Sequence, residues 1–339
     1  MNKRATISEV AEKAGVSRAA VSKVLRNAYG LSDEMREKVG VAMHALNYRP
    51  QTAARGLRGS TYTIGVLLPE IRNPFFPDIL DGIVHRLEGT PYQPLLGVRL
   101  SAEKNESSIV ETMMDRKLDG FIMIAPLLNH VYIANVAKYV PTVVIGRHDR
   151  EGGFDTINND DEQGAHLAVD HLVSLGHRRI AHVSLEPLFE GSGNNPMTFR
   201  LKGYEDAMRR HGLEQNIAVS FTTHLGGPEH DRVLALEILS RADRPTAIFA
   251  WMDSVALTIM SAASELGLRV PQDLSVIGYD NSNIGALSQL SLTSIDQSAN
   301  LLGEKSAQLL FERMEGRAED VSFIVPPRLV ARGSTSILP

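Results

Sequence analysis

The stretch from Thr6 to Arg26, TISEVAEKAGVSRAAVSKVLR, constrains the fold of this chain more than any other. It predicts two short helices joined by a tight turn. Thr6 and Glu9 have the spacing of a capping box, in which two side chains satisfy free amides at a helix start. Gly15 suits a left-handed helix end, and Ser17 is a good cap for the second helix. Any small helical hairpin could share this pattern, so the pattern alone leaves that interpretation open.

The second helix would carry a polar, cationic outer face. Val21, Val24 and Leu25 recur at helical spacing and would point inward. A short polar face with cations, on the second helix of such a pair, suits a reader of the DNA major groove. The residues left on this outer face are Arg18, Ala19, Ser22, Lys23 and Arg26.

Charge is distributed unevenly along the chain. Residues 1–59 contain four Lys and seven Arg against four Glu and one Asp, a net charge of +6. The other residues hold 24 basic and 35 acidic side chains, a net −11, which leaves the chain at −5. A small basic part on a larger acidic body suits a module that binds a polyanion such as DNA.

The remaining sequence predicts one more helix and then a large α/β region. The residues from Ser32 to Tyr48 indicate a third helix, which would complete a small helical domain. From Thr63, apolar runs such as TIGVLL, GFIMIA, TVVIG and LSVIGYD alternate with amphipathic stretches. Apolar runs separated by helices are typical of parallel strands buried on both faces. Repeated units of this kind predict two doubly wound sheets.

Several motifs occur together and in order along the chain. TISEVAEKAGVS, AAVSKVLRN and NYRPQTAARGLRGS open it, and IGVLLPEIRNPFF, LGHRRIAHVS, RLKGYEDAM, LRVPQDLSVIGYD and LTSIDQ follow. In these motifs the sequence resembles the LacI/GalR (lactose/galactose repressor) family of bacterial transcriptional regulators. The resemblance implies a small all-α helix-turn-helix head over 1–49 and a hinge helix over 50–61. An α/β periplasmic-binding-protein-like core of two doubly wound parallel-sheet subdomains would then fill 62–339.

Within the core, the resemblance implies that the chain crosses between the two subdomains three times. We expect crossovers near Asp160, Ser291 and Phe323. The N-subdomain would then comprise about 62–160 and 292–323, and the C-subdomain about 161–291 and 324–339. A ligand would lie between them, at the carboxyl ends of the strands. No heptad tail follows Thr335, so a homodimer on a pseudo-palindromic operator is expected.

Residues of the head and hinge are expected to contact double-stranded operator DNA. The hydroxyls of Thr6 and Ser17, with helix-start amides, would hold phosphates. The outer face of the second helix would meet base edges, where Lys or Arg bonds guanine and Ala19 offers only an apolar contact. In the hinge, the resemblance implies that Leu57 wedges into the minor groove and Arg55 lies along the adjacent backbone. A plain linker is the alternative.

Seven core residues are candidates for effector binding. By resemblance, Arg200 in RLKGY matches the arginine that binds effector in this family. Asp280, ending IGYD, matches an acid that pairs with ligand hydroxyls or purine nitrogens. Either residue could instead be structural, and at least one of the two phenylalanines could be core packing. The seven candidates are Phe75, Phe76, Arg147, Arg200, Trp251, Asp253 and Asp280.

Two departures from the family pattern bear on the ligand. The segment HLGGPEHD places Gly226 or Gly227 where relatives often carry an aromatic ring. That change could mean a larger ligand, or a platform supplied by Trp251 instead. The loop before Arg200, SLEPLFEGSGNNPMTF, is also longer than usual and could admit a disaccharide.

The sequence lacks the motifs of common enzymes and metal sites. HExxH, a phosphate loop and GxSxG are absent, so we expect no catalysis and no cofactor. His166 and Asp170 share a helix face, but a surface or structural role is favoured over a metal. The absence of Cys excludes disulfides and thiol catalysis. No apolar run would span a bilayer and MNKRATIS is no signal segment, which predicts a cytoplasmic protein.

Together these features predict a sequence-specific DNA-binding transcriptional regulator. We expect a repressor of carbohydrate-utilisation genes whose effector is a mono- or disaccharide. Two alternatives within the same family remain: a purine-responsive regulator in which ligand promotes DNA binding, and a regulator controlled by a partner protein. A binding protein or sugar enzyme on the same fold is disfavoured by the basic head and the missing catalytic motif.

Overall fold

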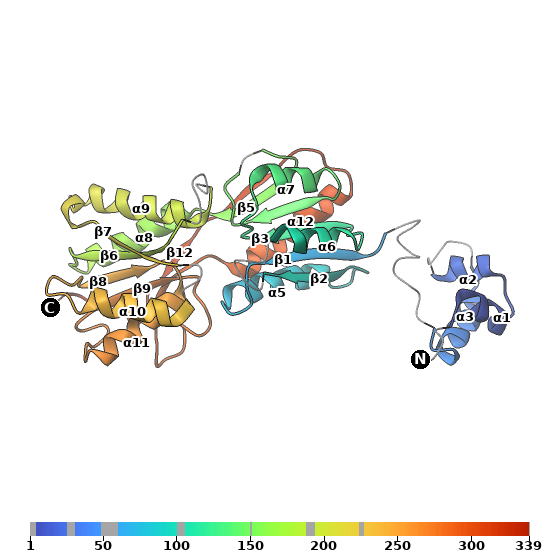
Figure 1. The fold of residues 1–339 in the computed structure, drawn as a ribbon, viewed down its shortest axis with the longest axis horizontal. Coiled ribbons are helices and arrows are strands. Elements are labelled where there is room, and N and C mark those ends of the chain that lie inside the picture. Colours follow the sequence, from blue (N-terminus) through green and yellow to red (C-terminus); the bar gives the residue numbers. More distant parts are fainter. Residues whose placement is uncertain are drawn as a thin grey trace. The chain divides into compact units, whose positions relative to one another are not determined.

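The computed structural model describes residues 5–25, 31–48, 60–99, 106–149, 151–187, 194–223 and 227–338. These residues fall into two compact units, a head within Met1–Thr63 and a core within Ile64–Pro339. Figure 1 shows the helices of the head and the two sheets of the core. Arg26, Arg55, Leu57, Gly226 and residues 50–59 of the predicted hinge lie outside the described residues.

The described residues of the head form three helices whose ends follow from local sequence. Thr6 caps the first helix as a capping box with Glu9, and Gly15 closes it in the left-handed conformation at φ +66°. The Ser17 hydroxyl accepts the Ala20 amide at 3.1 Å and so caps the second helix. Val10, Val21 and Val39 are fully buried and join the helices in one small core. The helices are α1 (Ile7–Ala14), α2 (Arg18–Leu25) and α3 (Asp33–Ala45).

The first sheet of the core has the strand order β11-β5-β4-β3-β1-β2. The pairs β1–β3, β3–β4, β4–β5 and β5–β11 are parallel. Helices α5 and α12 pack on one face and α6 and α7 on the other. The strands are β1 (Thr63–Leu68), β2 (Gln93–Val98), β3 (Gly120–Ile124), β4 (Thr142–Ile145), β5 (Asp155–Asn159) and β11 (Ser322–Val325), and the helices are α5 (Phe75–Leu87), α6 (Glu106–Met114), α7 (His130–Ala137) and α12 (Ala299–Met314).

The second sheet has the order β12-β10-β9-β8-β6-β7, and only its pairing of β10 with β12 is antiparallel among the described pairs. Helices α8 and α9 cover one face, and α10 and α11 cover the other (Figure 1). The elements are β6 (Ile180–Leu185), β7 (Ala218–Thr222), β8 (Ala247–Ala250), β9 (Ser275–Tyr279), β10 (Thr293–Asp296), β12 (Arg328–Val330), α8 (Asp161–Ser174), α9 (Pro196–Arg210), α10 (Gly227–Leu239), α11 (Asp253–Glu265) and the 3-10 helix Glu214–Asn216.

The chain passes between the two sheets three times. The first passage is at Asp160, between β5 and α8. The second lies between Asp296 and Ala299 rather than near Ser291, because β10 pairs with β9 in the second sheet. The third follows Val325 rather than Phe323, because β11 stays paired with β5 to that residue. Residues 292–296 therefore belong with the C-subdomain and 324–325 with the N-subdomain.

Helices α5 and α12 approach each other closely on one face of the first sheet. A methyl group on Gly82 would overlap the backbone oxygen of Asn300, and one on Gly303 would overlap that of Ile79. Only glycine allows this backbone contact. The close packing fixes Phe75 and Phe76, at the start of α5, against the carboxyl ends of the strands.

Candidate functional site

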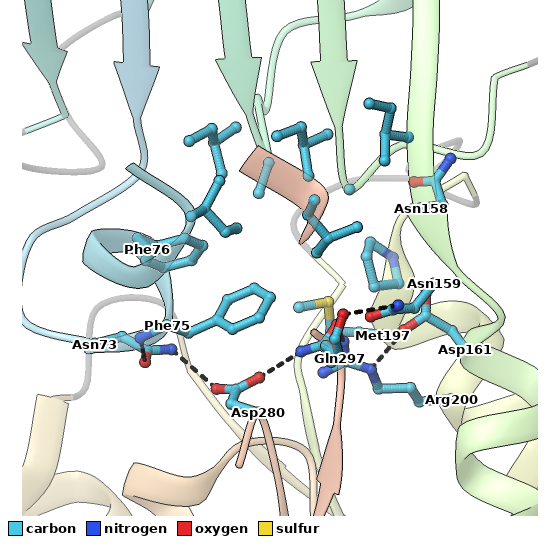
Figure 2. Close-up of a pocket in the computed structure, with 18 of the residues that line it drawn as sticks. Asn73, Phe75, Phe76, Asn158, Asn159, Asp161, Met197, Arg200, Asp280 and Gln297 are labelled. Atoms are coloured by element: carbon cyan, nitrogen blue, oxygen red, sulfur yellow. Dashed lines mark hydrogen bonds and ion pairs between the residues drawn. The ribbon is translucent and has the colours of Figure 1, made fainter. Parts of the chain in front are cut away.

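A cavity lies between the carboxyl ends of the two sheets in the core. It encloses about 530 Å³ of empty space, part of it open to solvent. Parallel sheets bind ligands at this position because their strand ends and helix starts converge there. Figure 2 shows aliphatic side chains along much of the N-subdomain side, with Asn158 and Asn159 at one end of it, and Asp280 and Arg200 on the opposite side. The polar or aromatic residues that line the cavity are Asn73, Phe75, Phe76, Asn158, Asn159, Asp161, Arg200, Trp251, Asp280 and Gln297.

Arg200 is the centre of the polar side. Its side chain donates to Asp161 Oδ1 at 2.8 Å, to the Trp251 carbonyl at 2.8 Å and to Gln297 Oε1 at 3.1 Å. The guanidinium also lies 3.7 Å from the centre of the Tyr279 ring, a cation–π contact. Burial alone would lower the pKa of Arg200, but Asp161 and the other nearby acids outweigh it and raise that pKa. Arg200 is therefore a fixed cation whose charge is balanced by Asp161.

Asp280 follows β9 and connects the two sides of the cavity. Its carboxylate accepts from Gln297 Nε2 at 2.5 Å and from Asn73 Nδ2 at 3.2 Å. Its backbone has φ +108°, a conformation that costs about 1–3 kcal/mol for a residue with a side chain and is found most often at functional sites. Burial, and then the charge of Asp253, raise the pKa of Asp280 to about 8.

A second connection between the subdomains lies across the cavity from Asp280. His148, in the loop between β4 and β5, bonds the Oδ2 of Asp161 through Nε2 at 2.9 Å. Its ring also packs on Phe199 of α9, with 4.2 Å between ring centres. Beside it, Asn194 donates to Asp149 at 2.9 Å. The subdomains are thus held together on both sides of the cavity.

The aromatic side chains of the cavity come from both subdomains. Phe75 and Phe76 form an edge-on pair with 5.7 Å between ring centres, and the Phe75 amide donates to Asn73 Oδ1 at 3.0 Å. Both phenylalanines line the cavity, although Phe75 is also part of the first-sheet core. Trp251, after β8, is held by a bond from Nε1 to the Thr222 hydroxyl at 3.0 Å.

Two predicted effector residues do not reach the cavity. Asp253 is the first residue of α11, and its carboxylate accepts from the Ser294 hydroxyl and the Ser282 amide, each at 2.6 Å. It therefore ties α11 to the segments after β9 and within β10, and it is absent from the cavity lining. Arg147 also lies outside the lining, because its side chain bonds Asp149 at 2.9 Å and the Leu128 carbonyl at 2.7 Å.

Five polar lining residues were not among the predicted effector residues. Asn73 precedes the predicted Phe75 in the motif NPFF, and Gln297 follows the last strand of the motif LTSIDQ. Both therefore stood at strand or helix ends, where ligands bind in such folds. Asp161, the first residue of α8, lies at a similar position directly after a strand end. No local signal distinguished the other two, Asn158 and Asn159, from residues of an ordinary strand end.

In the described part of the head, the predicted DNA-contacting residues lie at α2, except Thr6, which caps α1. Ser17, Arg18, Ala19 and Lys23 are exposed and Ser22 is half-buried, so they share the outer side opposite Val21. The Ser17 hydroxyl caps α2. At the start of α1, the hydroxyl of the capping residue Thr6 accepts from the Glu9 amide at 3.3 Å and lies 2.9 Å from the Glu9 carboxylate. A phosphate would compete with Glu9 for Thr6.

His166 and Asp170, which share a face of α8, do not form a metal site in the described part of the chain. Asp170 instead bonds Arg210 at 2.7 Å and His211 at 2.6 Å. Over the ranges that the structure describes, no group of three or more His, Cys, Asp or Glu side chains converges as a metal would require. Within the same ranges, no helix is both long and apolar enough to cross a bilayer.

Comparison with protein families matches both parts of the chain. Residues 6–51 match the model for bacterial regulatory proteins of the lacI family, and residues 169–335 match that for a periplasmic binding protein-like domain. The chain is 32% identical to the HTH-type transcriptional repressor PurR of Vibrio vulnificus, over 97% of this chain and 98% of that protein. It is 31% identical to the ribose operon repressor of Escherichia coli K12, over 97% and 99%.

Solved structures give the same result. The lac repressor dimer bound to operator and the anti-inducer ONPF superimposes with a TM-score of 0.82 at 29% identity. The alignment covers 98% of this chain and 100% of that one. Head, core and their order along the chain are therefore shared with these proteins.

Proposed function

Since the chain belongs to the LacI family of bacterial DNA-binding transcriptional repressors, we propose that its operator affinity is set by a small neutral sugar bound between the two core subdomains. The repressed genes would be genes of carbohydrate use, and the protein would act in the cytoplasm. The effector would be a mono- or disaccharide. The observation that carries this proposal is the charge balance of the polar side of the cavity.

Charge balance argues for a neutral ligand. Arg200 is the only cationic side chain in the described lining, and Asp161 neutralises it at 2.8 Å. A sugar phosphate or another anion would need a cation that is not already paired. Burial raises the pKa of Asp280 to about 8, which favours its neutral form. Neutral hydroxyls suit such a site better than charged groups.

The shapes of the lining side chains also suit a sugar. Arg200, Asp280 and Gln297 present planar polar groups held rigidly by one another, and such groups bind adjacent hydroxyls. Phe75 and Phe76 offer aromatic surface to C–H groups. One relative, the ribose operon repressor, is named for a sugar operon.

The head would read the operator as proposed from the sequence. The outer face of α2, from Arg18 to Lys23, would enter the major groove, and Arg26, Arg55 and Leu57 would extend the contact. Two heads are needed for a two-fold operator, so we propose a homodimer. The lac repressor, which resembles this chain over its whole length, forms a dimer on its operator.

A purine effector is the second candidate. The side-chain oxygens of Asn158 and Asn159 have no partner among the described residues, and ring N–H groups of a purine would satisfy them as well as hydroxyls would. A relative at 32% identity is the repressor PurR. In that case ligand would promote operator binding rather than relieve it.

A thermal-shift screen of the full-length protein against sugars, sugar phosphates and purines tests the proposal. A ligand at one hundred times its Kd stabilises the folded state by about 2.7 kcal/mol. We expect a shift with neutral sugars, lost in Arg200→Ala but kept in Arg210→Ala, which removes an exposed arginine of the same helix. A shift with purines alone would replace the sugar by the second candidate, and no shift at all would favour control by a partner protein.

A further inference from the structure

The N-subdomain side of the cavity changes from polar to aliphatic along one sheet edge. The ends of three neighbouring strands, β5, β4 and β3, form this wall. Only β5 ends in polar side chains, Asn158 and Asn159, whereas β4 and β3 end in Ile145 and Ile124. Figure 2 shows the asparagines at one end of the wall and the aliphatic side chains beyond them.

The residues that follow β4 and β3 keep the wall apolar. They are Gly146 and Ala125, both at positive φ, +75° and +44°. Their amides are already bonded to the Ile157 and Ile145 carbonyls, at 3.1 and 2.8 Å. Ile79, Ile157 and Leu302 complete the wall. A ligand hydroxyl facing this wall would therefore leave water and find no side chain to bond.

Hydrogen bonds fix the orientation of both asparagine side chains and leave their oxygens without a donor. Asn158 donates from Nδ2 to the Arg147 carbonyl at 2.7 Å, and Asn159 donates to the Gln297 and Val325 carbonyls, each at 3.1 Å. A backbone carbonyl only accepts hydrogen bonds, so the amide atom that faces it must be the NH2 nitrogen, and the other amide atom is the oxygen. Both oxygens are buried without a partner in the described structure, and buried acceptors are normally bonded. A ligand that donates at this end would supply the missing bonds.

We infer that the effector is a pentose or a 6-deoxyhexose, a sugar with no hydroxyl on its C5 substituent. The inference rests on the proposed sugar effector and narrows it. In an aldopyranose the hydroxyls of C1 to C4 occupy adjacent carbons along one edge. Two of them donate to the oxygens of Asn158 and Asn159, and the others face Arg200 and Asp280. The C5 hydrogen or methyl group lies against Ile124 and Ile145.

Isothermal titration of the full-length protein tests this with sugars that differ only at C5. Four matched series are used: D-xylose, 6-deoxy-D-glucose and D-glucose; L-arabinose, D-fucose and D-galactose; D-lyxose, D-rhamnose and D-mannose; D-ribose, 6-deoxy-D-allose and D-allose. In the series that binds, the pentose or deoxy sugar should have a Kd ten- to about 100-fold lower than the hexose, because apolar pockets reject an added hydroxyl by up to about that factor.

Two variants test the wall itself. Asn158→Leu should weaken binding of the preferred sugar at least tenfold, while Asn135→Leu, an exposed asparagine of α7, should leave it unchanged. Ala125→Asn places an amide on the aliphatic wall in a backbone conformation that asparagine tolerates. Relative to the unsubstituted protein, this variant should bind hexoses more tightly in comparison with pentoses. It therefore tests the role of the aliphatic wall even if Asn158→Leu does not fold.

The outcomes separate this inference from the proposed function. A hexose that binds as tightly as the pentose or 6-deoxyhexose of its series overturns the inference and leaves the sugar proposal standing. Binding of purines with no sugar bound overturns both.

Discussion

Removing the positive charge of Arg200 should destabilise the core strongly, because it leaves Asp161 buried without its cation. Asp161 is 2% exposed and Arg200 3%. Breaking a buried ion pair by removing one partner costs about 3–5 kcal/mol. His148 remains 2.9 Å from the other oxygen of Asp161 and retains part of the stabilisation. For Arg200→Met we therefore expect a loss near the lower limit, about 3 kcal/mol.

The double variant Arg200→Met/Asp161→Leu distinguishes a lost charge pair from lost packing. With both charges gone no buried ion is left alone, and apolar replacements of a buried pair are often neutral. We expect the double variant to recover at least half of the stability that Arg200→Met loses. It should still fail to bind effector, because the guanidinium is absent. Stability and ligand binding would thus respond differently to the second substitution.

Urea unfolding followed by fluorescence and circular dichroism measures these changes. Trp251 is the only tryptophan of the chain and lies in the cavity wall, so its emission reports on this part of the core. With a slope of about 3 kcal/mol per M urea, a loss of 3 kcal/mol lowers the midpoint by about 1 M. A shift below about 0.3 M for Arg200→Met, or a double variant no more stable than the single one, would refute the reasoning.

Three further predictions concern the acid of the cavity, the connection between the subdomains and the hinge. The pKa of Asp280 is raised in the folded state, so its protonated form is favoured there, and stability should fall as pH rises from about 4 to about 8 and level off above. Asp280→Asn should flatten this dependence in urea midpoints taken at pH 5 to 9, and an unchanged slope would contradict it. Asn73→Ala removes the bond from the N-subdomain to Asp280 and should weaken effector binding by roughly tenfold in calorimetry, about the value of one hydrogen bond; equal affinity would show that this bond does not contribute to effector binding. Leu57→Ala should weaken binding to operator DNA far more than to scrambled DNA in gel-shift titrations, and an equal loss on both would exclude the wedge role.

Local features of the fold were readable from sequence because each depends on a few neighbouring residues. The capping box of Thr6 and Glu9 and the left-handed Gly15 are present as predicted. The two mostly parallel sheets are also confirmed. The crossover after Asp296 was predicted near Ser291. That prediction was wrong because the sequence TSID does not indicate which sheet this strand joins. The sheet that a strand joins depends on its pairing with a strand distant in the sequence, and local sequence patterns do not show this pairing.

The cavity was predictable only in part for the same reason. Phe75, Phe76, Arg200, Trp251 and Asp280 were proposed from motifs and do line it. Asn73 was missed, although it bonds Asp280, a residue 207 positions away along the chain.

The direction in which a side chain points is a second property of the site that the sequence does not give. Asp253 starts a helix after a strand, as a ligand-binding residue would, yet its carboxylate points to Ser282 and Ser294. Arg147 likewise follows a strand and turns to Asp149. Motif position identifies the edge of the sheet but not which way a side chain points from it.

The three passages of the chain between the sheets have a consequence for how the protein is made. The first sheet is incomplete until β11, close to the end of the chain, has left the ribosome, and α12, which covers the sheet, is also late. Domains usually fold in order of synthesis, but here each sheet needs a late strand, β11 in the first sheet and β12 in the second. The head is a separate unit encoded first. A ribosome that stops before residue 299 would therefore release a DNA-binding part attached to a core that cannot form its ligand cavity.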